Sequence, residues 1–307
     1  MTGPRTLDGA RDAAFPDPFG AQRPRLIRLA YRMLGSLAEA EDVAQDAWLR
    51  WQGADRAVIH DPAGWLVRVT TRLSIDRLRA DKARRAAYRG PWLPEPLIED
   101  IAEDPVERAE DVSVAFLLAL ERLSPLERAV FLLHDVFETD YPDVAETLHR
   151  SEAACRQLAA RAREHVRQAQ PRFQVARDDA ARLAVAFMDA AHRNDLTALK
   201  SLLAEDAVMI TDGGGKRGAA LRPLVGREDV VQFIAGLNWR WPDSLELVRL
   251  ARINGCPGAI VRGTDGLATM AFEPDGAGRI GAIYVVRNPE KLRGLEAAAN
   301  SPGRPGG

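Results

Sequence analysis

The sequence predicts a multidomain protein, in which a helical N-terminal half precedes a C-terminal domain of mixed α and β structure. In the first 170 residues, apolar side chains recur at the spacing of amphipathic helices. After Pro171 the pattern changes to short β-like runs separated by turn signals, such as Asp212-Gly213 and Asn254-Gly255. The length of 307 residues allows about two domains, each with its own core.

The first helical segments predict a small bundle. Residues 24–51 form two amphipathic stretches with Gly35-Ser36 between them. Residues 53–63 indicate a loop, and one long basic helix then runs from Trp65 to about Ala87. Prolines at 91, 94 and 96 cannot continue that helix, so an extended linker is expected behind it.

Charge is segregated along this part of the chain, although the formal net charge is only −2 and the pI is about 6.3. Residues 64–89 carry eight Lys and Arg side chains against two Asp. Residues 95–111 carry eight Asp and Glu side chains against one Arg. A basic block beside an acidic block indicates charged partners rather than a particular fold.

The second helical part has specific start signals. Ser124-Pro125-Leu126-Glu127 is a capping box with proline at the first helical position. Two short helices are predicted over residues 139–167. Asp140 is expected to cap the first, and Ser151 the second. Between them, His149-Arg150 form a tight turn, which histidine tolerates because it accepts left-handed backbone better than most residues.

The second of these two helices is rich in arginine. Ala154, Leu158 and Ala162 fall on one face, and the basic side chains lie mostly off it. This pattern predicts a helix-turn-helix, whose second helix enters the major groove of DNA. The alternative interpretation is a helical hairpin with a solvated basic face.

The C-terminal part predicts an α+β domain with a curved antiparallel sheet, because helical segments from Arg177 to about Leu203 precede the β-like runs. Candidates for catalysis are few. His192 is expected at a helix end in solvent, and Asp212, Asp265 and Asp275 precede glycine as turn residues do. Acid–base chemistry needs a convergent pair of groups, so we predict no enzyme, no catalytic residue and no cofactor.

Cys155 and Cys256 lie far from any Cys/His cluster, so no metal site is predicted. Two lone cysteines are typical of a reducing compartment, and the sequence has neither a signal-peptide pattern nor an apolar run long enough for a membrane span. These features predict a cytoplasmic protein. The Gly- and Pro-rich residues 297–307 predict a disordered tail.

Residues 25–51 (RLIRLAYRMLGSLAEAEDVAQDAWLRW) and 62–85 resemble region 2 of bacterial extracytoplasmic-function sigma factors, and RLSPLERAVFLLHDVF with the helix-turn-helix resembles region 4. Three motifs match a subgroup, the sigma-J-like factors with a fused C-terminal domain: WLPEP (92–96), DGGGK (212–216) and NPEKL (288–292). The resemblance implies an all-α region 2 bundle and an all-α region 4, followed by a SnoaL-like cone-shaped α+β barrel. The expected boundaries are 18–88 for region 2, 89–112 for the linker, 113–172 for region 4 and 178–296 for the C-terminal domain.

The resemblance also implies partners, namely core RNA polymerase and promoter DNA. The polymerase would meet one face of the acidic helix, comprising Asp42, Gln45, Asp46 and Leu49. The −10 promoter element would be held by cations of the basic helix: Arg68, Arg72, Arg77, Arg79, Lys82, Arg84 and Arg85. The −35 element would meet the second helix of the helix-turn-helix through Ser151, Glu152, Arg156, Gln157 and Arg161. Some of these charges must be ordinary solvated side chains.

In this subgroup the C-terminal domain packs on the promoter-binding part and tunes its activity. We therefore expect regulatory contacts between the linker, through Trp92 and Pro94, and two loops of the C-terminal domain. The loop residues are Asp212, Gly213, Gly214, Gly215 and Lys216, with Asn288, Pro289 and Lys291. Lys216 is placed to meet a carboxylate or phosphate, and Lys291 to bridge to the linker or region 2. A small ligand inside the barrel is possible and nothing in the sequence names it.

Two other interpretations of the sequence remain open. A one-component transcription regulator would combine the helix-turn-helix with a ligand-binding domain. This interpretation assigns no function to the acidic helix or to the long basic helix. A SnoaL-type enzyme would need paired catalytic groups in a cavity, and the sequence offers no strong pair.

Overall fold

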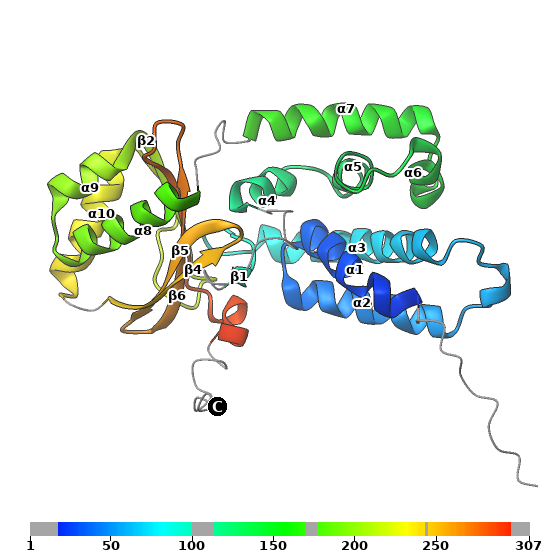
Figure 1. The fold of residues 1–307 in the computed structure, drawn as a ribbon, viewed down its shortest axis with the longest axis horizontal. Helices are drawn as coiled ribbons and strands as arrows, with labels where there is room; N and C mark the ends of the chain where they lie inside the picture. Colours follow the sequence, from blue (N-terminus) through cyan, green and yellow to red (C-terminus); the bar gives the residue numbers. More distant parts are fainter. Residues whose placement is uncertain (1–17, 100–112, 170–176, 243–244, 296–307) are drawn as a thin grey trace, which may run out of the picture.

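The computed structural model describes residues 18–99, 113–169, 177–242 and 245–295. Two helical domains lie one above the other on the right of Figure 1, and the sheet-containing C-terminal domain lies on the left. The linker after the first domain crosses between these parts. The expected succession of two all-α domains and one α+β domain is confirmed.

The first domain consists of α1 (Pro18–Leu34), α2 (Leu37–Gln52) and α3 (Pro62–Ala86). Gly35 has a φ of 69°, which ends α1, and the Ser36 hydroxyl accepts the Glu39 N–H at 3.3 Å to begin α2. Asp61 caps α3 by accepting the Gly64 N–H at 3.0 Å. The loop before α3 contains a short 3₁₀ turn, η1 (Arg56–Val58). These caps explain why the helices begin and end where they do.

The second domain consists of α4 (Val114–Glu121), α5 (Pro125–Phe131), the π-helical turn η3 (Leu132–Val136), α6 (Tyr141–Leu148) and α7 (Glu152–Ala169). The capping box at Ser124 and Glu127 is present. His149 ends α6 in the left-handed conformation with a φ of 51°, as expected for the turn of the helix-turn-helix. Asp140 stands at the cap position of α6, but its side chain makes no capping bond, contrary to prediction.

The buried face of α7 differs slightly from the prediction. Cys155, Ala159 and Ala162 are fully buried, whereas Ala154 and Leu158 are half-buried. The predicted apolar stripe therefore begins one residue too early. Where α7 crosses α5 and α4, the neighbouring row of side chains is the one that faces them. The small side chains on this face allow that close crossing.

The two helical domains share one hydrophobic core. Leu29, Met33 and Leu66 from the first domain, and Leu120 and Leu132 from the second, are each 1% exposed or less and belong to one cluster. Full burial of one such side chain stabilises a fold by about 1.5–3 kcal/mol. The arrangement of the two domains is thus held by apolar packing as well as by charge.

The C-terminal domain has three helices and a seven-stranded sheet among the described residues. The helices are α8 (Arg177–His192), α9 (Leu196–Leu202) and α10 (Arg227–Arg240). The strands that belong to the domain are β2 (Leu203–Asp212), β3 (Leu224–Val225), β4 (Glu246–Ile253), β5 (Cys256–Gly263), β6 (Gly266–Pro274) and β7 (Ile280–Val286). The sheet order is β1-β4-β5-β6-β7-β2-β3, in which β1 (Ile98–Glu99) comes from the linker.

Two features of this sheet were not predicted. β2 and β7 pair in parallel, so the sheet is mixed rather than antiparallel. The long connection from β2 through α10 and the β4–β6 meander makes this possible, because parallel neighbours need a crossover. In addition, linker residues Ile98–Glu99 form the edge strand β1, which pairs with Ile253 and Arg252 of β4.

The sheet buries both of its faces. α8, α9 and α10 cover one face, where Phe187 packs on Phe272 with ring centroids 5.0 Å apart. The other face faces the helical domains (Figure 1), and there Leu93 of the linker and Val114 of α4 join Ile253 and Tyr284 in one apolar cluster. The linker is therefore part of the core that joins the domains. Within the described residues, no helix combines the length and apolar character needed to cross a membrane.

Candidate interdomain seam and nucleic-acid interface

The second helix of the helix-turn-helix presents its predicted DNA-reading residues to solvent. Ser151, Glu152, Arg156, Gln157 and Arg161 are all exposed. The Ser151 hydroxyl accepts the backbone N–H of the third helical residue at 3.3 Å, so Ser151 caps α7 as predicted. Glu152 pairs with Arg156 at 3.0 Å, and Arg161 with a glutamate of α5 at 3.3 Å. Both arginines are themselves exposed, and ion pairs at the surface contribute about 0–1 kcal/mol, so these contacts hold them weakly.

The acidic face of α2 is also open. Asp42, Gln45, Asp46 and Leu49 are exposed and lie together on one side of the helix, with Leu49 54% exposed. Asp42 lies 3.9 Å from the guanidinium of Arg77, a loose contact. The face is therefore available to a basic partner surface.

The cations of α3 divide into two groups. Arg77, Arg79 and Lys82 point to the surface, with Arg79 at 3.5 Å from Asp76 of the same helix. Arg84 pairs with Asp81 at 2.5 Å and with Glu39 of α2. The remaining predicted −10 cations, Arg68, Arg72 and Arg85, instead make contacts between domains.

Arg72 and Arg68 hold the C-terminal end of α6. The Arg72 guanidinium donates to the carbonyl oxygens of Thr147 at 2.9 Å and Glu146 at 3.1 Å, and Arg68 lies 3.8 Å from the Glu146 carboxylate. A cation here is favoured because the last carbonyls of a helix are unpaired and carry partial negative charge. Two cations assigned to promoter DNA are thus occupied by the helix-turn-helix domain.

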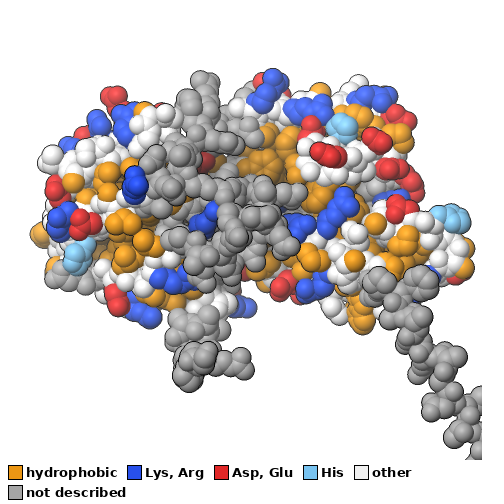
Figure 2. All heavy atoms as spheres, in the orientation of Figure 1, with side chains coloured by type: hydrophobic (Ala, Val, Ile, Leu, Met, Phe, Trp, Pro, Cys, Tyr) orange, Lys and Arg blue, Asp and Glu red, His pale blue; other side chains and the backbone are white. Residues whose placement is uncertain are grey.

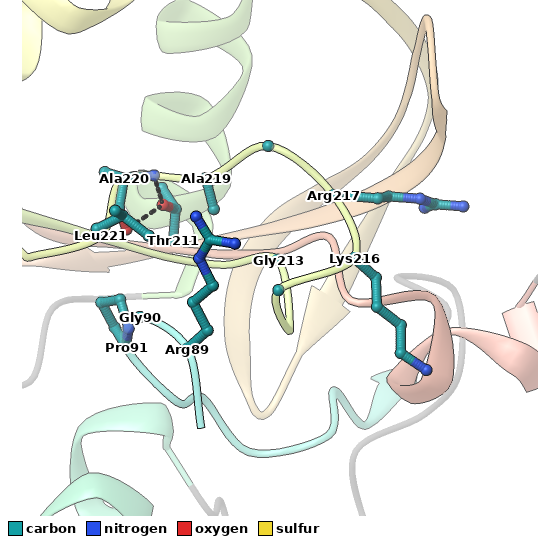
Figure 3. A pocket seen from close by; sticks show the side chains of 12 residues that line it. Arg89, Gly90, Pro91, Thr211, Gly213, Lys216, Arg217, Ala219, Ala220 and Leu221 are labelled. Carbon is teal, nitrogen blue, oxygen red and sulfur yellow. Dashed lines mark hydrogen bonds between the residues drawn. The ribbon is translucent and has the colours of Figure 1, made fainter. Parts of the chain in front are cut away.

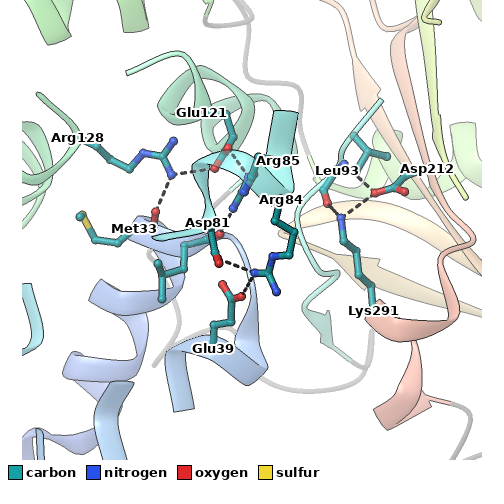
Figure 4. Close-up of polar contacts among 11 residues, drawn as sticks. Met33, Glu39, Asp81, Arg84, Arg85, Leu93, Glu121, Arg128, Asp212 and Lys291 are labelled. Atoms are coloured by element: carbon teal, nitrogen blue, oxygen red, sulfur yellow. Dashed lines mark hydrogen bonds and ion pairs between the residues drawn. The ribbon is translucent and has the colours of Figure 1, made fainter. Parts of the chain in front are cut away.

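Arg85 takes part in a charge cluster at the junction of α1, α3 and α4 (Figure 4). It donates to the Leu34 carbonyl at 2.6 Å and pairs with Glu121, which also binds Arg128 at 2.8 Å. Arg128 is 3% exposed and donates to the Met33 carbonyl, and burial lowers its pKa. Sequence reasoning assigned Arg85 to DNA because nothing local distinguishes it from its exposed neighbours.

The linker seam, formed by residues 88–98 and the side chains that bind them, joins the first helical domain to the C-terminal domain. Asp212 lies at its centre. The carboxylate is fully buried and accepts hydrogen bonds from the Tyr88 hydroxyl at 2.6 Å, the Leu93 N–H at 2.9 Å, the Gly214 N–H at 2.9 Å and the Lys291 ammonium at 2.7 Å. Asp212 accepts the Gly214 N–H as a turn residue does, and because β2 extends to this position it also reaches the linker.

Lys291 lies opposite Asp212 on η4 (Pro289–Lys291). Its ammonium also donates to the Leu93 carbonyl (Figure 4). The same ammonium lies 4.2 Å from the ring centroid of Trp92. Its side chain is 12% exposed, and burial lowers the pKa of Lys291 to about 8, although Asp212 opposes this shift. The charge-assisted contacts fix the linker backbone at Leu93.

Trp92 carries cations from two domains on its ring. The Arg85 guanidinium lies 3.8 Å from the ring centroid, in addition to Lys291. The indole packs over Gly35, where an added Cβ would overlap it. Pro94 is buried next to these contacts. Trp92 therefore bridges region 2 and the C-terminal domain, and cation–π pairs contribute about 0.5–2 kcal/mol each.

The two C-terminal loops also hold each other. The Asn288 amide donates to the Tyr88 hydroxyl at 2.8 Å and leaves no room for a Cβ at Gly214, which has a φ of 63°. Lys216 meets a carboxylate as predicted, but the partner is Glu290 of the neighbouring loop rather than the linker. Gly215 packs on the side chain of Arg89, and Gly213 faces backbone of its own loop. The structure brings all these predicted residues together; their regulatory role stays a prediction.

Sequence reasoning missed Asn254, which makes a second set of contacts across the seam. Its backbone N–H donates to the Leu97 carbonyl at 2.8 Å, its side-chain oxygen accepts the Leu97 N–H at 3.2 Å, and its amide donates to the Tyr31 hydroxyl of α1 at 2.7 Å. Tyr31 in turn donates to the Glu95 carbonyl at 2.7 Å. The Asn-Gly dipeptide predicts a turn at Asn254. Nothing in the neighbouring sequence predicts its three hydrogen bonds to the linker and to α1.

Glu95 belongs both to the acidic block and to the WLPEP motif. Its carboxylate accepts the Ser36 hydroxyl and the Leu37 N–H, both at 2.9 Å, and so caps the N-terminus of α2 from the linker. With Asn254 and Tyr31, it anchors the WLPEP segment to region 2.

A buried carboxylate lies on the face of the sheet that packs against the linker and the helical domains. Glu273 is 8% exposed and accepts the Tyr284 hydroxyl at 2.8 Å, and burial raises its pKa. His192 is exposed at the end of α8, as predicted. The described residues contain no group of three or more His, Cys, Asp or Glu side chains placed to hold a metal ion.

Comparison with known families gives two matches within the helical domains. Residues 19–84 match Sigma-70 region 2, and residues 113–166 match Sigma-70 region 4. These ranges cover α1–α3 and α4–α7, the elements that carry the acidic face, the basic helix and the helix-turn-helix.

Two relatives match this chain over most of their own length. The ECF RNA polymerase sigma factor SigJ of Mycobacterium tuberculosis is 41% identical over 290 residues, covering 90% of this chain and 92% of SigJ. The probable ECF RNA polymerase sigma factor SigI of the same species is 30% identical over 294 residues, covering 90% and 94%. The crystal structure of SigJ superposes with a TM-score of 0.73 at 37% identity, covering 90% of this chain and 97% of that one.

Proposed function

This chain belongs to the extracytoplasmic-function RNA polymerase sigma factors, and from that premise we propose how its three domains divide the work. As an alternative sigma factor it binds core RNA polymerase and directs transcription initiation at a promoter. We propose that it acts in the cytoplasm, together with these partners. The C-terminal domain modulates this activity in cis through the linker seam.

The contacts of the linker carry the proposal of regulation in cis. Leu93 is bound through its N–H by Asp212 and through its carbonyl by Lys291, while Leu97 is bound on both sides by Asn254. A linker that follows the nucleic-acid channel of the polymerase, as those of the family do, has to leave these partners. Docking of the linker on the C-terminal domain therefore competes with polymerase binding. The equilibrium between the docked and the released linker sets the activity in transcription initiation.

The promoter-binding surfaces support a second element of control. Arg68 and Arg72 bind the end of α6 in this arrangement, so region 2 and region 4 cover part of each other. We assign the −10 contacts first to the exposed Arg79 and Lys82 and the half-buried Arg77, and propose that Arg68 and Arg72 join them once region 4 moves away. The −35 contacts are assigned to Arg156 and Gln157, near the start of α7 where base edges are read.

The core-binding face is proposed to be Asp42, Gln45, Asp46 and Leu49, because it combines carboxylates with an exposed leucine on one side of α2. The test is a native gel shift of the full chain with bacterial core RNA polymerase, beside the double variant Asp42→Ala/Asp46→Ala. Binding that is weakened in this variant supports the assignment. A matched control is Glu205→Ala/Asp206→Ala, which removes two adjacent acidic residues of the C-terminal domain.

Complete absence of polymerase binding, even in variants whose seam contacts are removed, would contradict a role in initiation. It would favour the one-component regulator, which needs the helix-turn-helix but no polymerase. A variant such as Asn254→Gly, which loosens the seam, separates this outcome from simple autoinhibition, because only an autoinhibited sigma factor gains binding when the seam opens.

A further inference from the structure

A cavity lies at the edge of the linker seam, where the linker passes the glycine loop. Its volume is about 390 Å³, and its walls come from Arg89, Gly90 and Pro91 of the linker and from Thr211, Gly213 and residues 215–221 of the C-terminal domain (Figure 3). Pockets for small molecules typically measure about 300–1,000 Å³. The cavity is separate from the Asp212–Lys291 contact, since neither of these residues lines it.

The lining is positively charged. It contains Arg89, Lys216 and Arg217 and no acidic side chain. The Arg217 guanidinium points away from the cavity (Figure 3) and donates to two backbone carbonyls. Lys216 pairs with Glu290. Arg89 instead extends toward the loop across the cavity, and its guanidinium has no ion-pair partner among the described residues. An unpaired guanidinium facing a cavity favours an anionic ligand.

The rest of the lining suits a small amphiphile. Glycines at 213, 215 and 218 keep the loop wall free of side chains, so a ligand atom can approach the backbone closely. The Thr211 hydroxyl accepts the Ala220 N–H at 2.8 Å and fixes this wall. On the other side, Pro91 and Leu221 are apolar, and Leu221 is 65% exposed although it is a large apolar residue. Because the cavity is charged at one end and apolar at the other, the expected ligand has a charged group and an apolar part.

We propose that this cavity binds a small organic oxyanion, a phosphate or carboxylate on a short apolar body, with Arg89 as its anchoring cation. Because the walls come from both the linker and the C-terminal domain, such a ligand binds the docked form of the seam and not the released form. By mass action it stabilises docking and lowers polymerase binding. This second step rests on the proposed function, whereas ligand binding does not.

Binding is tested on the full chain by isothermal titration calorimetry with hexyl phosphate, hexanoate and uncharged 1-hexanol as probes. At least one anionic probe should bind, and the stronger one identifies phosphate or carboxylate as the preferred head group. Arg89→Gln should weaken that binding by about tenfold or more, the scale of one charge-assisted hydrogen bond. The matched control Arg222→Gln, an exposed arginine outside the cavity, should leave it unchanged.

The site is overturned if no anionic probe binds, if 1-hexanol binds equally well, or if Arg89→Gln and Arg222→Gln behave alike. The coupling is tested separately by the native gel shift with core polymerase in the presence of the bound probe. Reduced polymerase binding by the wild type, but not by Arg89→Gln, supports it. Unchanged polymerase binding at a probe concentration that saturates the calorimetric signal overturns the coupling, and leaves the sigma-factor assignment untouched.

Discussion

The carboxylate of Asp212 and the ammonium of Lys291 lie 2.7 Å apart, and both bind Leu93, one through its N–H and the other through its carbonyl. The two residues belong to different loops of the C-terminal domain and come together only around this linker residue. Since Asp212 is fully buried and Lys291 nearly so, the pair depends on the linker for its hydrogen bonds as much as the linker depends on the pair. The predictions below follow from this dependence.

Replacing Lys291 by methionine should release the linker. The change keeps the length of the side chain but removes the donor that binds the Asp212 carboxylate and the Leu93 carbonyl, and each buried acceptor left without a partner costs about 1–3 kcal/mol. We expect faster tryptic cleavage in the linker and stronger binding to core polymerase. Lys200→Met, which removes an exposed ion pair with Glu228, is the matched control. Equal cleavage rates for the two variants would argue that the seam is not held by this pair.

The Lys291 ammonium should make docking depend on pH. Its pKa is about 8 in the seam and 10.5 when it is free, so the released form binds more protons between these values. The seam therefore becomes more stable as pH rises from 8 towards 10.5, and its stability is constant below pH 8. The measurement is the linker cleavage rate from pH 7 to pH 9.5, with a protease active throughout. In Lys291→Met, the cleavage rate should no longer depend on pH through this group. If the cleavage rate of Lys291→Met varies with pH as that of the wild type does, the pH dependence does not come from Lys291.

Replacing Trp92 by leucine should weaken the seam without opening a large cavity. The variant keeps an apolar side chain over Gly35 but loses the aromatic ring that carries Arg85 and Lys291. The expected loss is about 1–2 kcal/mol in the free energy of unfolding, measured by urea denaturation. Trp239→Leu, at a position that is 85% exposed, should change this value by less than about 0.5 kcal/mol. A loss at Trp92 no larger than at Trp239 would rule out the bridging role.

Asn254→Gly isolates the contacts that the sequence did not reveal. Asn254 has a φ of 50°, which glycine adopts without strain, so the turn should survive while the side-chain bonds to Leu97 and Tyr31 disappear. Loss of buried hydrogen bonds predicts a cost of about 1–3 kcal/mol. Asn194→Gly is a close control, since Asn194 has a φ of 53° but is exposed. Hydrogen exchange at Leu97 should rise only in Asn254→Gly; protection that persists there would refute the prediction.

Arg72→Ala should loosen the helix-turn-helix from region 2. The guanidinium caps the last carbonyls of α6, and its removal leaves them without that partner. We expect faster hydrogen exchange over Tyr141–Leu148 and a cost of about 1–3 kcal/mol. Arg79→Ala, on the same helix but exposed, should leave exchange in α6 unchanged. If both variants exchange alike, apolar packing alone holds the two domains together.

Most helices and their ends were determined locally. The capping box at Ser124 and Glu127, the proline in the first turn of α6 and the left-handed His149 all follow from a few neighbouring residues, because caps and turns are satisfied within one or two turns of backbone. The acidic face of α2 could be predicted for the same reason, since helical periodicity places its members together whatever the helix packs on.

The tertiary structure decided which polar residues join the domains. Arg84 and Arg85 are sequence neighbours, yet one pairs on the surface of region 2 and the other enters the cluster around Glu121. Asp212 reads locally as a turn residue but is the buried centre of the seam, and Asn254 binds residues more than 150 positions away. The sequence by itself determined the helices, the domain order and the motifs, because these rest on local periodicity and capping. The roles of single charges required the fold, because burial and partners come from segments that only the packed chain brings together.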